Sequence, residues 1–198
     1  MNAPSDPRPH YIAATRWVTN LMDGVPADRL HAPTPCTEFD VSALMGHLIG
    51  TARRSRALSR GEDIFAVAMS SDHPSAAEYA SVVAEAVDSW SDDARLTALV
   101  RVPWGEVPGA GALWGYVNET LVHGWDLAVA TGQPAEVETA AAEAAITVAR
   151  QFIPAEIRAD DDVPFGPVVE PRPDAGATER LANWSGRTHP ALIAAPVE

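Results

Sequence analysis

The chain has 198 residues, 46% of them hydrophobic, which is enough for one ordinary domain with a real core. Its 27 acidic residues outnumber the 14 basic ones, and the formal net charge of −13 argues against nucleic acid or an anionic membrane as a partner. Every basic residue is arginine, and the absence of lysine excludes Schiff-base chemistry and a P-loop lysine.

Cysteine content and hydropathy predict where the protein works. Cys36 is the single cysteine, so no internal disulfide can form, which is typical of a reducing compartment. Residues 1–9 are polar and proline-rich, without the basic-then-apolar order of a signal peptide. No apolar stretch approaches the roughly 20 residues that span a bilayer. We therefore expect a cytoplasmic protein, monomeric or a small homo-oligomer.

Helical periodicity dominates the first half of the chain. A first helix is expected over about residues 10–22, and a proline-containing loop over 25–39 follows it. Asp40 is a suitable N-cap for a second helix over about 41–59, which Gly61 would end. A third helix is expected over 74–90, with Pro74 in its first turn. The residues expected to face the core from the first helix are Ile12, Ala13, Val18 and Leu21.

The second half begins with a short segment, residues 101–108, whose prolines and glycine suit a small hairpin or an extended crossing. The strongest helix of the sequence follows over 111–131, and an alanine-rich helix over about 136–152. After residue 154 the composition changes to proline, aspartate and glycine, with one short helix expected over 178–184. The sequence thus predicts one all-α domain over 1–198, with a helix bundle at about 9–153 and an irregular C-terminal arm at 154–198.

The helix over 111–131 carries three ionisable side chains, Glu119, His123 and Asp126, on one narrow arc. They have two interpretations. They are either the solvated face of an amphipathic helix or polar groups on a buried helix, which need partners. The absence of any other charge over 111–131 favours the buried helix. Glu and His at positions i and i+4 then suit two ligands of one metal ion.

His47 lies at the edge of the apolar stripe of the second predicted helix, in line with Leu44 and Thr51. A lone histidine there is most simply a boundary residue that bonds to water or to a backbone carbonyl. A second histidine and a carboxylate on another helix make a shared metal site a competing interpretation, because bundles build such sites from facing helices.

Several motifs give the chain a family resemblance. The segments TPCTEFDVSALMGHL at 34–48, ETLVHGWDLA at 119–128 and TGQ at 131–133 resemble the mycothiol-dependent maleylpyruvate isomerase N-terminal domain, of the DinB-like metal-binding superfamily. FGPV at 165–168, RLA at 180–182 and GR at 186–187 resemble the tail of its single-domain members. The resemblance covers nearly the whole chain.

This resemblance implies a DinB-like four-helix bundle with a divalent metal, zinc by analogy, held by His47, Glu119 and His123. Three protein ligands leave a fourth position for water or a thiolate, as in catalytic zinc sites, although the same donors suit other divalent ions. It also implies a small-molecule substrate and a low-molecular-weight thiol such as mycothiol. The isomerase of the family has a second, C-terminal domain, and the residues after 152 are too few and too proline-rich for one.

Other residues invite a functional interpretation more weakly. Asp126 either orients His123 from behind the metal or is a surface carboxylate. Cys36 has no positive charge beside it in sequence and is expected to be a buried rather than a reactive thiol. The remaining histidines are expected to be solvated and three tryptophans to lie in the core or a pocket wall; these are His10, His31, His73 and His189, and Trp104, Trp114 and Trp125.

Two classes of function fit these residues. One is a metal-dependent enzyme that uses a low-molecular-weight thiol, as an isomerase or an S-transferase. The other is a helical metal-binding module without catalysis, acting as a sensor, a carrier or an interaction partner. A metal position open to exchangeable ligands distinguishes the enzyme from a closed structural site. A third reading is a metal-free bundle that has lost its site. No residue of the sequence is assigned a catalytic role beyond metal binding.

Overall fold

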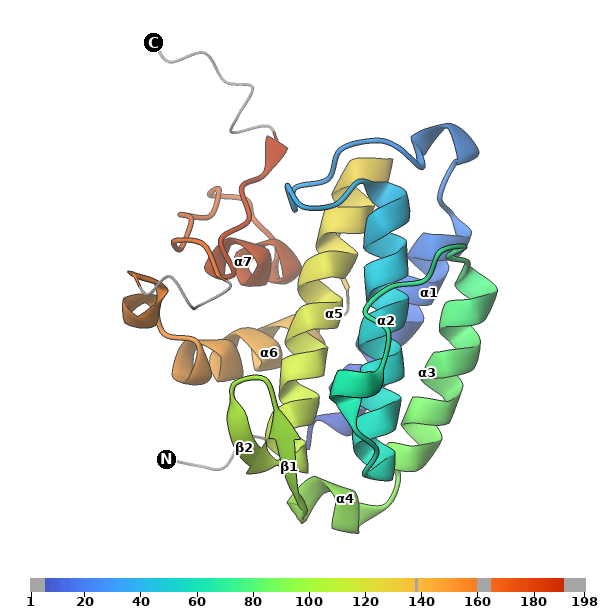
Figure 1. Ribbon diagram of the computed structural model, residues 1–198. Coiled ribbons are helices and arrows are strands. Elements are labelled where there is room, and N and C mark those ends of the chain that lie inside the picture. Colours follow the sequence, from blue (N-terminus) through green and yellow to red (C-terminus); the bar gives the residue numbers. More distant parts are fainter. Residues whose placement is uncertain (1–5, 138, 160–164, 191–198) are drawn as a thin grey trace.

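A computed structural model describes residues 6–137, 139–159 and 165–190, so the ends of the predicted arm and of the N-terminal segment lie outside the description. The described chain is mostly helical, with one antiparallel hairpin (Figure 1). None of its helices is both long and apolar enough to cross a membrane. The longer elements are α1 (Arg8–Asp23), α2 (Val41–Arg60), α3 (Ala76–Trp90), α4 (Asp93–Thr97), β1 (Leu99–Val102), β2 (Gly105–Pro108), α5 (Gly109–Thr131), α6 (Thr139–Phe152) and α7 (Ala177–Trp184); short 3₁₀ turns lie at Ala27–Arg29, Ile64–Ala66 and Ala155–Ala159.

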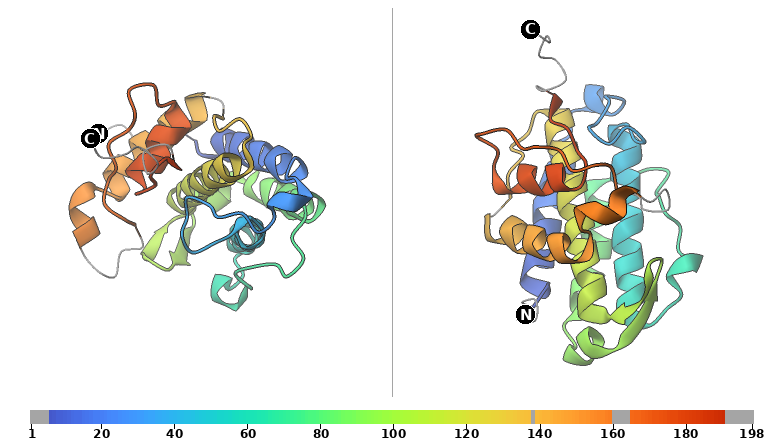
Figure 2. Two further views of the ribbon diagram at one scale, coloured as in Figure 1. Left: turned by 90° about the horizontal axis from the view of Figure 1, so that it is seen from above. Right: turned by 90° about the vertical axis from the view of Figure 1, so that its left-hand side faces the viewer.

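Four long helices pack against one another. The helices α1 and α2 each contact α3 on one side and α5 on the other. Seen along the helices, α5 lies at the centre (Figure 2). It contacts α1 and α2 of the four-helix group and also α6 and α7. The chain directions in Figure 1 show that α2 and α5 run antiparallel. The described chain is mostly helical, as predicted, while the specific DinB-like four-helix arrangement stays a prediction.

The helix ends follow local capping chemistry. The Asp40 carboxylate accepts the N–H of Ala43 at 2.8 Å, and Gly61 ends α2 in the left-handed conformation, both as predicted. Helix α3 begins later than predicted, because the hydroxyl of Ser75 caps it by accepting the N–H of Glu78. The hairpin of β1 and β2 and the short helix α7 are also confirmed, whereas α4 had no predicted counterpart.

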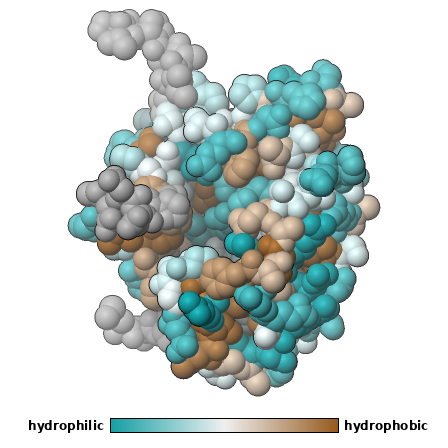
Figure 3. Space-filling model, viewed as in Figure 1, coloured by the Kyte–Doolittle hydropathy of each residue, from teal (hydrophilic) through white to brown (hydrophobic). Residues whose placement is uncertain are grey.

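Two predicted core residues are exposed, Ile12 by 44% and Trp104 by 63%. Ile12 lies off the buried stripe of α1, which is made of Tyr11, Ala14, Thr15, Val18, Leu21 and Met22. Trp104 lies between β1 and β2, and its ring covers Gly115 of α5 from outside. The space-filling view shows scattered apolar residues among hydrophilic ones on this face (Figure 3). In contrast, Trp114 and Trp125 are buried as expected.

The C-terminal arm is packed onto the bundle in its described part, where α7 contacts α5 and α6. Glu136 was expected to begin the α6 helix, but its carboxylate accepts the N–H groups of Thr178 and Glu179 at 2.9 and 3.1 Å. A carboxylate at this position satisfies the free N–H groups of the first turn of α7. Glu136 therefore fixes the arm to the bundle instead of extending α6.

A loop after α2 folds back along that helix and packs on it directly. A Cβ atom on Gly50 would lie 2.0 Å from the carbonyl oxygen of Met69, and one on Gly46 would lie 2.7 Å from that of Ser71. Only glycine permits so close an approach of the two backbones. Residues 69–71 therefore form a fixed wall beside His47, which follows Gly46.

Candidate metal centre

Helix α5 is buried around almost its whole circumference, and this contradicts the solvated-face interpretation of its polar arc. His123 is buried and Asp126 is fully inaccessible, while Glu119 keeps 35% of its side chain exposed. The four apolar residues on the other side, Leu113, Val117, Leu121 and Trp125, are buried as well. The polar groups of this arc consequently need partners within the protein, as the absence of other charges indicated.

Helix α2 supplies the partner from across the helix interface. The Nε2 atom of His47 lies 3.0 Å from Oε1 of Glu119, and Nε2 of His123 lies 3.3 Å from the same oxygen. The two imidazole rings stand edge to face with their centroids 4.8 Å apart. The structure thus brings together the three residues of the predicted ligand set, two from α5 and one from α2.

The spacing of these three donor atoms fits one small cation. All of them lie within 4.8 Å of one another. Ligands at zinc distances in tetrahedral geometry would be about 3.3–3.5 Å apart. Two imidazole nitrogens and one carboxylate oxygen are also a donor set that divalent transition metals accept. None of the three groups forms a hydrogen bond or an ion pair with an arginine among the described residues.

Without a metal, hydrogen bonds and an ion pair hold His47, Glu119 and His123 together. Burial raises the pKa of Glu119, but the neighbouring His123 and His47 outweigh it and hold that pKa well below its usual range. Burial lowers the pKa of His123, whereas Glu119 and Asp126 raise it, and the balance brings the pKa to about 9. His123 is therefore an imidazolium between two carboxylates at neutral pH, and its Nε2 proton occupies the side on which a metal would bind.

Asp126 has the position expected of a group that orients a ligand histidine. Its Oδ2 lies 3.1 Å from Nδ1 of His123. An Nδ1–H that donates to Asp126 leaves the lone pair of Nε2 for a metal. On its other side Asp126 accepts from Nε of Arg187, with that nitrogen 3.2 and 3.0 Å from its two oxygens. The interpretation of Asp126 as a surface carboxylate is wrong.

The arrangement of two histidines and a glutamate on these two helices lies within a segment that a known family model covers. The model of the mycothiol maleylpyruvate isomerase N-terminal domain matches residues 12–128. The chain belongs to this family. The match contains His47, Glu119, His123 and Asp126, whereas Arg187 lies outside it.

Relatives of this family member come from Mycobacterium tuberculosis. Uncharacterised proteins of strains CDC 1551 / Oshkosh and ATCC 25618 / H37Rv are each 30% identical to it over 177 residues. The alignment covers 85% of this chain and 90% of each relative, so the similarity extends beyond the segment that the family model matches. No solved structure matches the chain.

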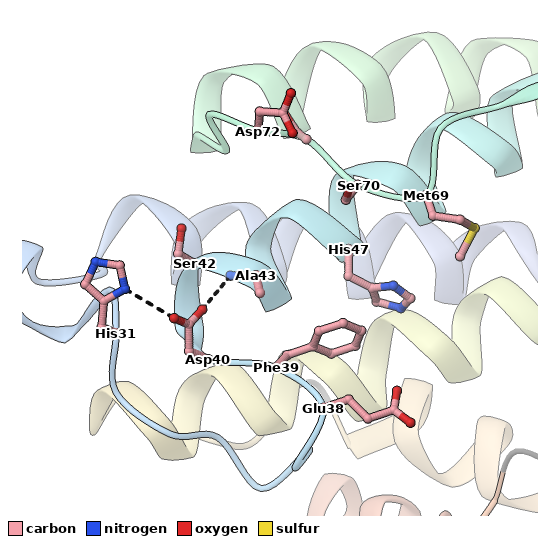
Figure 4. Close-up of a pocket in the computed structure, with 11 residues that line it drawn as sticks. His31, Glu38, Phe39, Asp40, Ser42, Ala43, His47, Met69, Ser70 and Asp72 are labelled. Carbon is pink, nitrogen blue, oxygen red and sulfur yellow. Dashed lines mark hydrogen bonds and ion pairs between the residues drawn. The ribbon is translucent and has the colours of Figure 1, made fainter.

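A cavity of about 680 Å³ adjoins the ring of His47 in this family member. Figure 4 shows the ring of Phe39 beside that of His47, with Met69 nearby. The two rings are stacked with centroids 4.9 Å apart, so Phe39 limits how the imidazole can turn. Hydroxyl and carboxylate groups also line the cavity, from Glu38, Asp40, Ser42, Ser70, Ser71 and Asp72. Its volume is in the range of small-molecule sites.

Cys36 is buried, as expected, yet it lies next to the centre. Its sulfur is within 4.8 Å of ligand atoms of His123 and Asp126, which makes these three a second conceivable metal group. Two facts weigh against it. Both oxygens of Asp126 already accept from Arg187, and burial raises the pKa of the Cys36 thiol even though Arg187 lowers it. No positive charge flanks Cys36 in the sequence. The charge that acts on its thiol belongs to Arg187, which follows it by 151 residues.

The remaining histidines divide into two pairs. His31 and His73 are exposed as predicted. The prediction is wrong for the other two, which are partly buried against tryptophans: His10 stacks on Trp114 with centroids 5.1 Å apart, and His189 lies 5.9 Å from Trp125. Sequence reasoning also missed Arg187 and Phe39 as parts of the site. The only signal was that both lie in segments that resemble the family.

Proposed function

We propose that this protein is a metal-dependent enzyme that binds zinc, or a similar divalent ion, through His47, Glu119 and His123 and activates a low-molecular-weight thiol such as mycothiol. The observation that carries the proposal is the convergence of two imidazole Nε2 atoms on one oxygen of Glu119, at 3.0 and 3.3 Å. Mycothiol is the thiol we propose because the family to which the chain belongs takes its name from a mycothiol maleylpyruvate isomerase. The reaction class is an isomerisation or an S-transfer.

The openness of the centre supports catalysis over a closed structural site. No fourth side chain among the described residues joins His47, Glu119 and His123 as a group, so a bound ion would keep a free position. Glu119 is partly exposed and His47 lines a cavity, which gives a small molecule a route to that position. A bound divalent ion would stabilise the thiolate of a coordinating thiol and so lower its pKa.

The residues of the chain supply orientation and charge balance. Phe39 stacks on His47, and Asp126 holds the ring of His123 through Nδ1. Arg187 forms an ion pair with Asp126, which offsets part of the cost of burying this carboxylate behind the histidine. The described part of the arm packs onto α5 and α6 and so holds Arg187 beside this carboxylate.

Cobalt substitution tests the proposal directly. Purified full-length protein is loaded with Zn²⁺ and analysed for metal, and a Co²⁺-loaded sample is titrated with mycothiol, cysteine and glutathione. We expect about one metal per chain and a sulfur-to-cobalt charge-transfer band with at least one thiol. Protein that stays metal-free after loading would overturn the metal assignment. A stoichiometric metal with no thiol band would overturn the thiol chemistry and leave the non-catalytic metal-binding module.

The stability of the metal-free protein and its affinity for zinc should depend on pH in opposite directions, because a proton and a metal ion compete for Nε2 of His123. In the metal-free protein the pKa of His123 is about 9, above the usual 6.5, so its stabilising contribution is present below about pH 6.5 and is lost as the pH rises through 9. Metal binding must displace the Nε2 proton, so zinc affinity should rise by up to about tenfold per pH unit over the same interval. Urea unfolding with and without zinc at pH 6.5 to 9 measures both trends. A zinc affinity independent of pH would contradict His123 as a ligand.

A further inference from the structure

One arginine of helix α2 has no ion-pair partner among the described residues, although the chain is rich in carboxylates. Its neighbours Arg53, Arg56 and Arg60 form ion pairs with Glu78 or Glu85 of α3. Arg54 makes no ion pair, hydrogen bond or aromatic contact with any described residue, and its Nε is buried without an acceptor. The residue as a whole is only half-buried. The Nε of Arg56 is buried without an acceptor too, but Arg56 has an ion pair with Glu85. A buried N–H of a charged group without an acceptor is costly, so an arginine that also lacks an ion pair is a candidate to bind an anionic ligand.

Arg54 is placed on the metal side of its helix. It follows His47 by seven residues, which returns it to the same face of α2 about 10 Å farther along the helix axis. The helix α5 runs antiparallel to α2 (Figure 1), so residues after His47 lie across from residues before Glu119. Tyr116 precedes Glu119 by three residues and therefore lies on this same side of the centre.

Tyr116 is a second polar group in this interface. Its side chain is buried. Burial and Tyr11 raise the pKa of Tyr116, Arg54 lowers it and Glu119 raises it. Tyr116 therefore lies close enough to interact electrostatically with Arg54 and with Glu119 of the predicted ligand set. Its neutral hydroxyl can donate a hydrogen bond.

We propose that Arg54 and Tyr116 form a carboxylate-binding subsite of the metal centre, so that the substrate carries an anionic group a few bonds from its metal-bound atom. A guanidinium and a phenol hydroxyl are both donors, and a carboxylate accepts from both at once. The helix geometry sets the separation between subsite and metal donors at roughly 5–10 Å. This inference rests on the proposed function and specifies its substrate class.

Arg187 is a poorer candidate for the same role. It already donates to both oxygens of Asp126, which neutralises its charge. Arg54 is the cation on the metal face of α2 whose charge no carboxylate of the described chain balances. An anionic substrate would gain most from this unbalanced cation, because its binding breaks no existing ion pair.

The test uses small thiols that differ in one charge. Co²⁺-loaded full-length protein is titrated with mercaptoacetate, 3-mercaptopropionate and 4-mercaptobutyrate and with the corresponding amides, and the cobalt charge-transfer band reports binding. We expect at least one acid to bind about tenfold or more tightly than its amide. Arg54→Gln should remove that preference while metal content and amide binding persist. Arg54→Lys and Tyr116→Phe should each remove part of it, and the paired, exposed Arg60→Gln should keep it.

The outcomes separate this inference from the proposed function. If each acid and its amide bind the wild-type protein equally well, the carboxylate-binding subsite is wrong, while the proposal of metal and thiol binding is unaffected. A preference for the acid that survives in Arg54→Gln overturns it too. Failure of the wild-type protein to bind metal or any thiol overturns the proposed function, and the subsite falls with it. If Arg54→Gln does not fold, the acid-to-amide ratio in wild type and in Tyr116→Phe still decides.

Discussion

His47→Ala, Glu119→Ala and His123→Ala should each abolish stoichiometric zinc binding, because each change leaves two of the three converging donors. We expect affinity losses above about 100-fold for each of the three. Asp126→Asn removes only the group behind His123 and should cost about 10–100-fold. Competition with a chromophoric chelator, combined with elemental analysis of the purified variants, measures these losses on one scale.

Cys36→Ser is the matched control for this series, because the thiol lies beside the centre but outside the expected ligand set. It should retain one zinc per chain with nearly wild-type affinity. If Cys36→Ser loses its metal while His47→Ala keeps it, the ligands are Cys36, His123 and Asp126, and the ligand assignment is wrong. Wild-type zinc affinity in all three alanine variants would mean that no metal is held here.

Arg187→Met should lower the free energy of unfolding by about 3–5 kcal/mol, the usual cost of removing one partner of a buried ion pair. Asp126 has no exposed surface and keeps His123 as its remaining ionic partner. Urea denaturation of the metal-free protein measures the effect. The matched control is Arg180→Met, whose guanidinium is more exposed, lies 4.0 Å from an exposed Glu143 and donates to the carbonyl oxygen of Ala175 at 2.8 Å. It should cost no more than about 1.5 kcal/mol, the usual value of one hydrogen bond.

A double variant tests the physical reason for that loss. Asp126→Asn removes the charge that Arg187 neutralises, so Asp126→Asn combined with Arg187→Met should be more stable than Arg187→Met alone. Equal stability of the two variants would show that Arg187 acts by packing rather than by charge. A change below about 1 kcal/mol in Arg187→Met itself would contradict the importance of this ion pair.

Local signals in the sequence predict much of the helical framework. Asp40 and Gly61 bound α2 through chemistry that involves a few neighbouring residues, and the same holds for Gly132 after α5. The near absence of charge on α5 predicts its burial, because a solvated face in so charged a chain would carry more ionisable groups. Glu119 and His123 are a candidate pair for the same reason, since residues four apart share a helix face.

The interactions between distant segments are what the sequence does not reveal. The pairing of Asp126 with Arg187 depends on how α7 docks against α5, and no periodicity encodes that contact. Glu136 suits a helix start by composition, but tertiary structure uses it to cap α7. His47 needs a partner helix before it differs from any boundary histidine. The unpaired state of Arg54 can be recognised only when the partners of its neighbours are known.

The position of Arg187 in the chain also bears on biosynthesis. Asp126 and Arg187 are separated by 61 residues, so a ribosome that adds about 5–20 residues per second needs roughly 3–12 s to travel from one to the other. During that interval the nascent bundle has its histidines and carboxylates but not the cation that balances Asp126. The centre therefore reaches its final charge state only after the arm has been translated and docked, so its completion comes later than the synthesis of its metal-binding helices.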